Sequence, residues 1–390
     1  MDLALFEYDL PPALIAQEPA EPRDASRLLV LDRRSRGWRD RRFSELPDLL
    51  RPGDCVVVNT SRVIPARLLG EVGTRAAELL LVRELSGARW EALVRPGRRC
   101  RRGARIALAG GVATATVVEE RPAGVRVVEI DAPAGVAALL ERHGLPPLPP
   151  YIGRHEAPKP EDRERYQTVY ARDGASVAAP TAGLHFTHEL MARLAARGVE
   201  VLGLRLDVGP ATFRPIGTAR PGGVAQLRGA GTTGGAARAG EAAPGGDPAR
   251  PGDGGPAGTG PRHEAVDVDA HVMEPEPIAI PPSTAEAIAR AKAEGRRVVA
   301  VGTTTTRALE SAADGRGGVR AGEGGAGLFI RPPHRFQLVD ALVTNFHLPR
   351  STLLVLVSAF ADRELILAAY AHAVAAGYRF YSFGDAMLIE

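Results

Sequence analysis

Apolar runs alternate with amphipathic stretches over both ends of the chain. Residues 54–58 form a continuous β-branched run, as expected for a strand buried on both faces. Further along, helical stretches that Thr187 and Ser283 would cap end at glycines, and strands stand between them. The expected helices are residues 187–197, 283–294 and 364–376, and the expected strands are 27–32, 199–208 and 297–301. This alternation predicts an α/β domain built from residues 1–65 and 151–390.

Residues 66–131 follow a different pattern. Regular short strands separated by glycine turns are typical of a small antiparallel barrel. The expected strands are residues 66–72, 77–84, 88–94, 104–109, 111–119 and 124–130. A helix over 134–143, closed by Gly144, and a proline-rich connector over 145–150 then lead back to the first domain. The sequence therefore predicts a small β-barrel domain, residues 66–150, inserted into the α/β domain.

Residues 217–264 break the alternation. The segment is dominated by Gly, Ala, Pro, Thr and Arg, and its only bulky aliphatic residues are Val224 and Leu227. Such a composition cannot bury enough apolar area to offset the entropy lost on ordering. We therefore expect a disordered surface insertion here.

Charge adds a candidate surface. The 390 residues carry a formal net charge of +3, with a pI of about 9.0, and Lys159 and Lys292 are the only lysines. A GC-rich genome would explain the excess of arginine, and so would a phosphate-binding surface. One turn of the predicted barrel concentrates arginines that suit a nucleic-acid backbone or simply form a solvated hairpin. They are Arg95, Arg98, Arg99, Arg101, Arg102 and Arg105.

Cysteine and hydropathy patterns exclude several classes of protein. Cys55 and Cys100 are the only cysteines and form no Cys-x-x-Cys pair, so neither a zinc site nor a disulfide framework is indicated. The N-terminus lacks the basic and apolar regions of a signal peptide. No apolar run reaches the roughly 18 to 20 residues that span a bilayer. We expect a soluble, cytoplasmic protein without a metal.

Three loop motifs offer the groups of a polar small-molecule pocket. Residues 179–186 read APTAGLHF and residues 344–349 read TNFHLP, so each places a histidine beside an aromatic ring. His185 and His347 are candidate general acids or bases near neutral pH, the alternative being structural histidines. In residues 302–307, GTTTTR lies between a strand and a helix and could hold an anion at the helix N-terminus, although ordinary capping would also explain the threonines.

Other motifs are weaker. Residues 322–327, GEGGAG, fit G-x-G-x-x-G, but no strand precedes them, so we expect a flexible turn. His271, Glu274 and Glu276 could ligate a metal by residue type. However, the prolines between them predict an extended segment that sets His271 beside Met273, which suits a sulfur-bearing or aromatic ligand better. Residues 353–360 fit either a strand or a buried helix.

Taken together, these segments resemble the S-adenosylmethionine:tRNA ribosyltransferase-isomerase family of queuosine biosynthesis. The resemblance covers nearly the whole chain outside residues 217–264. Its strings begin with LFEYDLP at residue 5 and NTSRVIPARL at 59, and continue with WEALVRPG at 90, YQTVY at 166, APTAGLHF at 179, GTT at 302, TNFHLPRSTLL at 344 and YRFYSFGDAMLI at 378.

The resemblance implies an α/β domain with an inserted β-barrel, in agreement with the hydrophobic pattern. It also implies transfer and isomerisation of the ribosyl unit of S-adenosylmethionine. The acceptor would be 7-aminomethyl-7-deazaguanine (preQ1) at the tRNA wobble position, and the products epoxyqueuosine-tRNA, adenine and methionine. S-adenosylmethionine would be a substrate, no metal would be needed, and a monomer is expected.

Site residues are implied in three groups. The catalytic candidates are His185, His347, His271 and Glu276. The substrate-binding candidates are Arg62, Thr181, Gly183, Phe213, Arg214, Met273, Thr303, Thr304, Arg307, Asn345 and Phe346. The six arginines between 95 and 105 would bind tRNA. The sequence departs from the family's motifs at Thr60, Asp207 and Glu274, so the alternative is a divergent protein that binds RNA or an adenosyl ligand without the full reaction.

Overall fold

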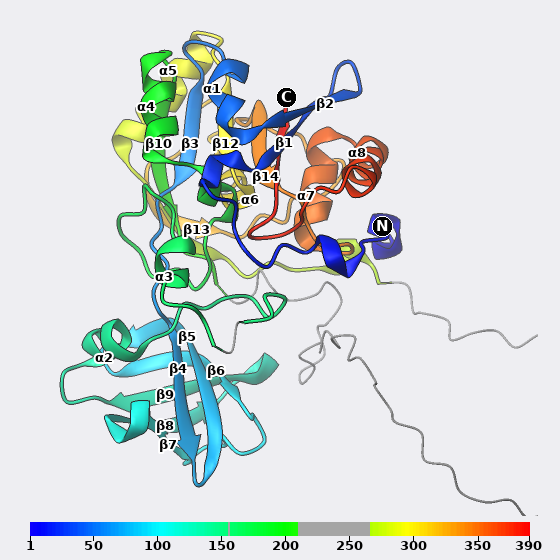
Figure 1. Cartoon of the computed structure of the whole chain (residues 1–390). Coiled ribbons are helices and arrows are strands. Elements are labelled where there is room, and N and C mark those ends of the chain that lie inside the picture. The colour runs from blue at the N-terminus through cyan, green and yellow to red at the C-terminus, as the bar shows by residue number, and fades with distance from the viewer. Residues whose placement is uncertain (155–156, 210–265) are drawn as a thin grey trace, which may run out of the picture.

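The structure, a computed structural model, describes residues 1–154, 157–209 and 266–390. It contains a large mixed sheet covered by helices and, below it in Figure 1, a closed six-stranded barrel. The expected fold class is thus confirmed. The segment for which disorder was expected, residues 217–264, lies outside the described residues.

The α/β sheet has the order β13-β11-β10-β3-β12-β14-β15-β1-β2. Its neighbours β10, β3, β12 and β14 are parallel, so their carboxyl ends lie at one edge, the edge that faces the barrel in Figure 1. The strands are β1 (Arg27–Asp32), β2 (Gly37–Arg42), β3 (Cys55–Asn59), β10 (Glu200–Leu206), β11 (Glu276–Ile280), β12 (Val298–Val301), β13 (Gly322–Ala326), β14 (Ala341–Asn345) and β15 (Ala386–Ile389).

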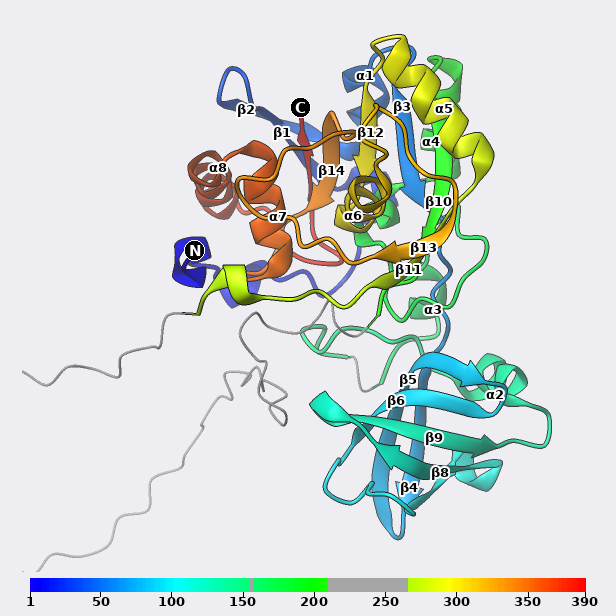
Figure 2. The same ribbon diagram turned by 180° about the vertical axis from the view of Figure 1, so that it is seen from behind.

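Helices cover both faces of this sheet, which explains the uninterrupted apolar runs of its central strands. Along β3, Cys55 and Val57 pack into one hydrophobic cluster and Val56 and Val58 into the opposite one. The first cluster lies under α5 (Pro282–Ala293), α6 (Thr303–Ala312), α7 (Thr352–Ala361) and α8 (Arg363–Ala375), and α6 and α7 stand in front of the sheet in Figure 2. The second lies under α1 (Leu46–Leu49) and α4 (His188–Ala196).

The structure confirms one local prediction, corrects a second and decides between the two alternatives of a third. Thr187 caps α4 by accepting from the Leu190 amide at 3.1 Å, as expected. Ser283 is not a cap, because α5 starts one residue earlier at Pro282, whose fixed φ suits the first helical position. The run at 353–360 lies in helix α7, where Ser351 accepts from the Leu354 amide at 3.2 Å.

The glycine-rich residues 322–327 are not a turn. Residues 322–326 form the edge strand β13, which pairs with β11 in register from Glu276–Ala326 to Ile280–Gly322. Backbone pairing with a formed neighbour needs no side chain, so tertiary context overrides the low strand propensity of glycine.

The barrel closes in the order β4-β5-β6-β9-β8-β7. All six expected strands are present, and α2 (Val136–His143) packs on their apolar interior. Their bounds are β4 (Arg67–Val72), β5 (Arg75–Ser86), β6 (Arg89–Arg95), β7 (Arg105–Leu108), β8 (Ala113–Glu120) and β9 (Val125–Asp131). The short helix α3 (Asp162–Arg165) follows the connector.

Gly144 ends α2 for a steric reason. Its φ is −71°, which any residue can adopt, so the left-handed cap expected from the sequence is not formed. A Cβ here would instead collide with the carbonyl oxygens of Pro65 and Leu140. Glycine is required because the two chain crossings between the domains approach closely.

Gly144→Ala should therefore lower the free energy of unfolding by about 1–3 kcal/mol, the usual cost of overpacking. Denaturant unfolding measures this loss. Gly97→Ala is the matched control, because its Cβ would meet only the Val94 carbonyl at 3.8 Å. Equal stability of the two variants would contradict the steric explanation.

Candidate active site

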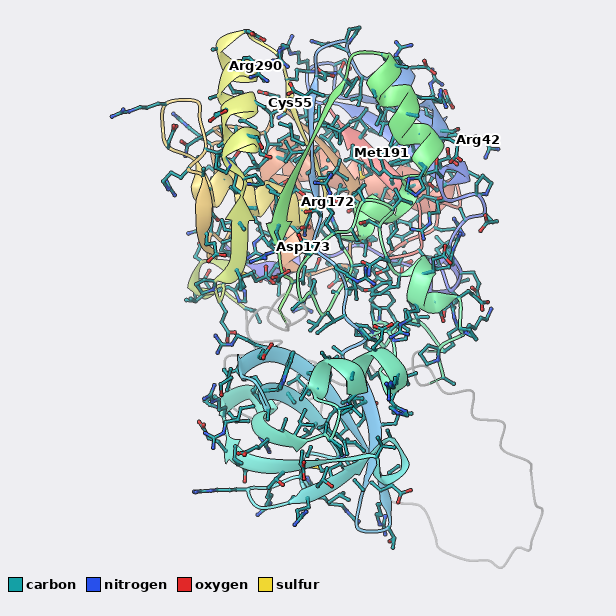
Figure 3. All side chains as sticks on the ribbon, turned by 90° about the vertical axis from the view of Figure 1, so that its left-hand side faces the viewer. Arg42, Cys55, Arg172, Asp173, Met191 and Arg290 are labelled. Atoms are coloured by element: carbon teal, nitrogen blue, oxygen red, sulfur yellow. The ribbon has the colours of Figure 1, made fainter. Side chains whose placement is uncertain are left out.

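The chain crosses from sheet to barrel at the carboxyl end of β3. Buried Asn59 ends that strand, and its amide donates to the Leu206 carbonyl at 2.9 Å while its side-chain oxygen accepts from the Leu206 amide at 3.0 Å. Backbone hydrogen bonds join this crossing to residues 172–176. The Arg172 amide donates to the Thr60 carbonyl, and the Arg62 amide donates to the Asp173 carbonyl, both at 2.9 Å. Figure 3 shows Arg172 and Asp173 on the barrel side of the sheet and Cys55 at the far end.

Thr60 and Asp207, two of the departures from the family motifs, lie at this crossing. Thr60 donates its hydroxyl to the Leu204 carbonyl at 3.0 Å. Asp207 accepts from the Ser61 hydroxyl and pairs with Arg205 at 3.5 Å. Both side chains therefore fasten β10 to the exit of β3. Glu274 is exposed.

His185 is buried at the end of the 3₁₀ turn Thr181–His185. Its Nε2 accepts from the Asn345 amide at 3.2 Å, its Nδ1 lies 2.8 Å from the Ser26 hydroxyl, and its ring stacks on Phe43 at 4.8 Å. Burial, reinforced by the charges of Arg379 and Arg23, lowers the pKa of His185 to about 3. The ring is therefore neutral at pH 7.

His347 is also buried and neutral. Its Nε2 lies 2.8 Å from the Thr344 hydroxyl, and its backbone amide donates to the Tyr370 hydroxyl at 3.0 Å. Burial lowers the pKa of His347 to about 3. The expectation that the two rings titrate near neutral pH is thus not met, because the sequence does not reveal how deeply each is buried. Proton donation at pH 7 by either ring would need an environment different from this one.

Arg307 and Glu276 form a buried ion pair, with side chains 4% and 3% exposed and an N–O distance of 2.5 Å. Arg307 also donates to the Ala326 carbonyl at 2.9 Å, and Glu276 accepts from the Gly209 amide at 2.9 Å. The pair fastens α6 to β11 and β13. Phe213 and Arg214 lie outside the described residues.

The threonine run begins α6 where that helix meets the Thr181–His185 turn. Thr305 and Thr306 donate to backbone carbonyls one turn earlier, at 2.7 and 3.1 Å. Buried Thr303 adjoins them, and the buried Thr304 hydroxyl has no hydrogen-bond partner within the described part of the chain. Gly183 is required on the facing turn, because a Cβ there would collide with the Tyr170 hydroxyl and lie 2.8 Å from Thr168 Cγ2.

Phe346 does not face a ligand. It is fully buried among Tyr370, Tyr378 and Phe380, with ring centroids 4.9 to 5.4 Å away. Because successive residues of an extended chain point to opposite sides, Phe346 enters the core when Asn345 turns toward His185. Its assignment to substrate binding stays a prediction that these core contacts do not support.

His271 and Met273 differ in their surroundings. Met273 is 7% exposed, and half-buried His271 packs edge-on against Phe329 at 4.9 Å. Burial lowers the pKa of His271, and its Nε2 has no partner among the described residues. His271 therefore holds a neutral ring with an unused nitrogen.

The three motifs meet at the sheet edge. The Asn345–His185 hydrogen bond joins two of them, and Ala182 packs beside Gly302 of the third. The His185 ring stacks on Phe43, whereas the Arg307 side chain donates to the Ala326 carbonyl and pairs with Glu276. A single pocket around His185, Arg307 and His347 stays a prediction.

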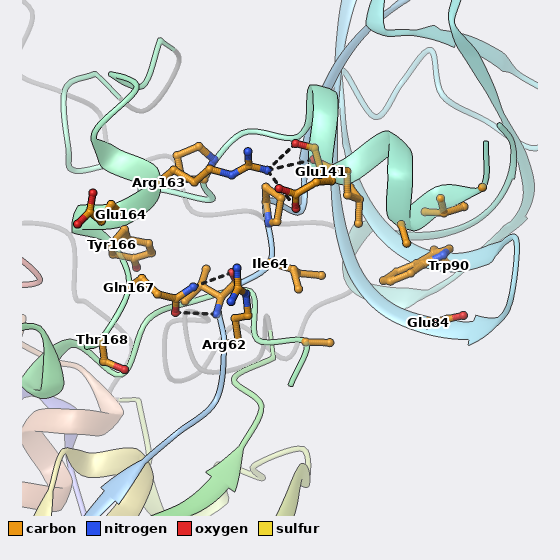
Figure 4. A pocket seen from close by; sticks show the side chains of 18 of the residues that line it. Arg62, Ile64, Glu84, Trp90, Glu141, Arg163, Glu164, Tyr166, Gln167 and Thr168 are labelled. Atoms are coloured by element: carbon orange, nitrogen blue, oxygen red, sulfur yellow. Dashed lines mark hydrogen bonds and ion pairs between the residues drawn. The ribbon is translucent and has the colours of Figure 1, made fainter. Parts of the chain in front are cut away.

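An open cleft of about 1120 Å³ lies between the two domains. Figure 4 shows Arg62, Gln167 and Thr168 on its α/β wall and Glu84 and Trp90 on its barrel wall. Among the predicted site residues that the structure describes, Arg62 alone lines it. The distance along the chain between the two walls explains why sequence reasoning missed the cleft.

Most residues of the cleft received no role from the sequence, among them Arg23, Trp90, Gln167 and Thr168. Trp90, Gln167 and Thr168 stand inside strings that carry the family resemblance, so a role could have been sought for them. Arg23 lies in a proline-rich stretch without any such signal. Its position in the cleft emerges only from the fold.

The six arginines between 95 and 105 form one exposed surface on the loop that joins β6 to β7. No ion pair involves their side chains within the described residues, whereas Arg83, Arg89 and Arg121 on the same barrel pair with glutamates at 2.8 to 3.1 Å. Arg95 ends the seven-residue β6, whose first residue follows the cleft-lining Gly87 and Ala88. The loop thus starts about 20 Å along the barrel from the cleft.

Acid should destabilise the protein through His185 and His347. Their folded pKa of about 3 lies below the ordinary value of 6.5. Between pH 3 and pH 6.5 the unfolded chain therefore binds more protons than the folded chain. The free energy of unfolding falls as the pH drops through this range, by about 1.4 kcal/mol per pH unit for each ring. Urea unfolding at pH 7.5 and 5.0 should show His347→Gln with a shallower pH dependence than wild type. The control is exposed His143→Gln, and a slope identical to wild type in His347→Gln would contradict the assignment.

Comparisons of this chain with known proteins agree on one family. The family model described as "Queuosine biosynthesis protein" matches residues 3–221 and 255–389. The S-adenosylmethionine:tRNA ribosyltransferase-isomerase of Symbiobacterium thermophilum is 48% identical over 391 residues, covering 100% of both chains. That of Thermus thermophilus is 49% identical over 399 residues, covering 99% of each. A solved structure, titled S-adenosylmethionine tRNA ribosyltransferase from Thermotoga maritima, is 33% identical, covers 99% of this chain and 100% of that one, and has a TM-score of 0.49. The chain belongs to the queuosine biosynthesis protein family.

Proposed function

We propose that this protein is an S-adenosylmethionine:tRNA ribosyltransferase-isomerase. It transfers and isomerises the ribosyl unit of S-adenosylmethionine onto preQ1 at the tRNA wobble position, and releases epoxyqueuosine-tRNA, adenine and methionine. The observation that carries this proposal is end-to-end similarity, at 48% and 49% identity, to relatives that bear this name. The divergent-binder alternative has no comparable support.

The interdomain cleft is the proposed substrate-binding site, and the described catalytic candidates, His185, His271, Glu276 and His347, lie outside its lining. Its volume of about 1120 Å³ exceeds the roughly 300–1,000 Å³ of ordinary ligand pockets, as a site for a nucleotide and a second substrate requires. It opens at the carboxyl edge of the parallel strands, where ligands of α/β sheets bind. Arg62 is exposed there without an ion-pair partner among the described residues and is available to a substrate anion.

The reaction needs a base, because the sulfonium of S-adenosylmethionine acidifies the neighbouring C5′ protons. Of the predicted catalytic residues, His271 suits this role best, since its ring is neutral at pH 7 and has an unused nitrogen. His185 and His347 are assigned as positioning residues, because Asn345 and Ser26 occupy both ring nitrogens of His185 and Thr344 occupies Nε2 of His347. Glu276 and Arg307 are assigned a supporting role. Their ion pair fastens α6 to β11, and Glu276 also accepts from the Gly209 amide.

Substrate contacts are assigned to residues around the same edge. Thr181, Gly183, Thr303 and Thr304 form the meeting point of the 3₁₀ turn and α6, and Met273 offers a soft apolar surface beside His271. Asn345 fixes the turn through His185. Phe213 and Arg214 stay predictions from the family motif. The six loop arginines hold the tRNA backbone outside the cleft.

The protein is further proposed to act as a cytoplasmic monomer. No helix in the described ranges is long and apolar enough to cross a membrane. Across the same ranges, no group of three His, Cys, Asp or Glu side chains could hold a metal ion. Sedimentation equilibrium tests the monomer.

The direct test of function is incubation with S-adenosylmethionine and tRNA carrying preQ1, followed by nucleoside mass spectrometry. Epoxyqueuosine should appear together with equimolar adenine. The control is tRNA with unmodified guanine at the wobble position, which lacks the nucleophilic amine. Binding of both substrates without any product would favour the divergent-binder alternative.

His271→Gln should lower kcat roughly 10² to 10⁴-fold, the usual contribution of a general base. Because burial lowers the pKa of His271 from 6.5, the wild-type rate should stay flat above pH 6.5 and fall only in more acidic solution. His143→Gln, on exposed α2, is the control. Wild-type kcat in His271→Gln would assign proton removal to another group.

Replacing Arg98, Arg101 and Arg102 together by alanine should weaken tRNA binding and flatten its salt dependence. Each lost phosphate contact lowers the log–log slope by roughly 0.7 to 0.9. The matched control replaces Arg83, Arg89 and Arg121, which glutamates already neutralise. If both triple variants bind alike, tRNA docks elsewhere.

A further inference from the structure

Carbonyl groups hold the Arg23 side chain in place, and no carboxylate among the described residues pairs with it. From the 3₁₀ turn Arg23–Ala25, its guanidinium donates to the carbonyls of Gln167 at 2.6 Å, Glu164 at 2.9 Å and, more weakly, Leu184 at 3.5 Å. Three carbonyl dipoles hold the group in place but carry no net charge. No ion pair involves Arg23 within the described residues.

The surroundings leave this charge incompletely balanced. Burial, followed by repulsion from Arg165, lowers the pKa of Arg23, and the carboxylates of Glu164 and Glu21 only partly oppose this. Glu21 is engaged by Arg165 at 2.6 Å. By contrast, Arg163 in the same cleft has Glu141 at 3.7 Å. Arg23 therefore differs from its neighbours in lacking a counter-ion.

Gln167 links the chain segments that carry Arg62 and Arg23. The Gln167 side chain accepts from the Val63 amide at 3.0 Å and donates to the Val63 carbonyl at 3.1 Å, as the dashed lines of Figure 4 show. The carbonyl of the same Gln167 accepts from Arg23. Both arginines line the cleft; Gln167 fixes the backbone of Val63, the residue that follows Arg62, and the guanidinium group of Arg23.

We propose that Arg23 and Arg62 form an anion subsite that binds one phosphodiester of the tRNA strand beside the wobble nucleotide. The inference rests on the proposed function and adds a contact that orients the acceptor. Two guanidinium groups from separate segments suit a phosphate, whose oxygens point in several directions, whereas a planar carboxylate is satisfied by one fork.

The positive charge of the subsite is local. Glu84, Glu141, Glu161 and Glu164 also line the cleft, and Glu84 and Glu161 have no ion-pair partner within the described residues. These carboxylates repel further phosphates. The cleft therefore suits one backbone phosphate with its flipped nucleotide, while the remaining backbone runs toward the β6–β7 arginines.

The test uses Arg62→Gln and Arg23→Lys, with Arg163→Gln as the matched control that already has a carboxylate neighbour. Binding of the preQ1-containing tRNA is measured by anisotropy over a series of KCl concentrations. Steady-state KM is measured for each substrate. Each test variant should raise the tRNA Kd and KM about tenfold to a hundredfold, as expected for a lost charged hydrogen bond. Each should also flatten the log–log salt slope by about 0.7, with the KM for S-adenosylmethionine unchanged.

Several outcomes separate the possibilities. A raised KM for S-adenosylmethionine with unchanged tRNA binding would overturn the proposal and assign the anion to the methionine carboxylate. An unchanged salt slope in Arg62→Gln, which loses no hydrogen bond of the fold, would also overturn it. If wild type makes no epoxyqueuosine, the proposed function fails, yet the binding measurements still decide whether the subsite holds an RNA phosphate.

Discussion

The architecture depends on the buried amide of Asn59. At the end of β3 the sheet ladder stops, and this side chain continues it by bonding both the amide and the carbonyl of Leu206 and the amide of Ser61. Without these bonds, buried backbone groups would lose their partners, which costs about 1–3 kcal/mol for each group. The same point sets where the crossing to the barrel begins, and so where Arg62 stands and how wide the cleft is.

Electrostatic pairing distinguishes structural arginines from those available to ligands. Arg154 pairs with Asp162 at 2.7 Å and Arg297 with Asp54 at 2.5 Å, and both carboxylates are buried. Such pairs hold segments together and leave little charge for a substrate. Arg23, Arg62 and the β6–β7 loop arginines have no such partner in the described residues. Their charge is therefore available to an anionic ligand.

The sequence revealed what depends on local periodicity. The barrel strands and the central strands of the large sheet follow from alternation and from continuous apolar runs. Residues 322–326 could not be recognised as a strand, because their pairing with β11 is a long-range contact that glycine propensity opposes. The motifs identified the sheet edge as the candidate site, but the burial of His185, the core position of Phe346 and the ion pair of Arg307 depend on packing. The cleft was invisible for the same reason, since its walls come from segments of both domains.

The position of β15 sets an order on folding. This strand, residues 386–389, lies between β14 and β1 and is the only strand that joins the β1–β2 hairpin to the rest of the described sheet. The barrel, by contrast, is made from one contiguous stretch of chain, so all of its strands emerge together. During synthesis on the ribosome, the barrel can therefore form before β15 is made. The β1–β2 hairpin stays unpaired until then, because β15 lies more than 350 residues after β1. Until β15 emerges, the apolar edge of β1 is exposed, so the first strand to be made is among the last to be protected from aggregation.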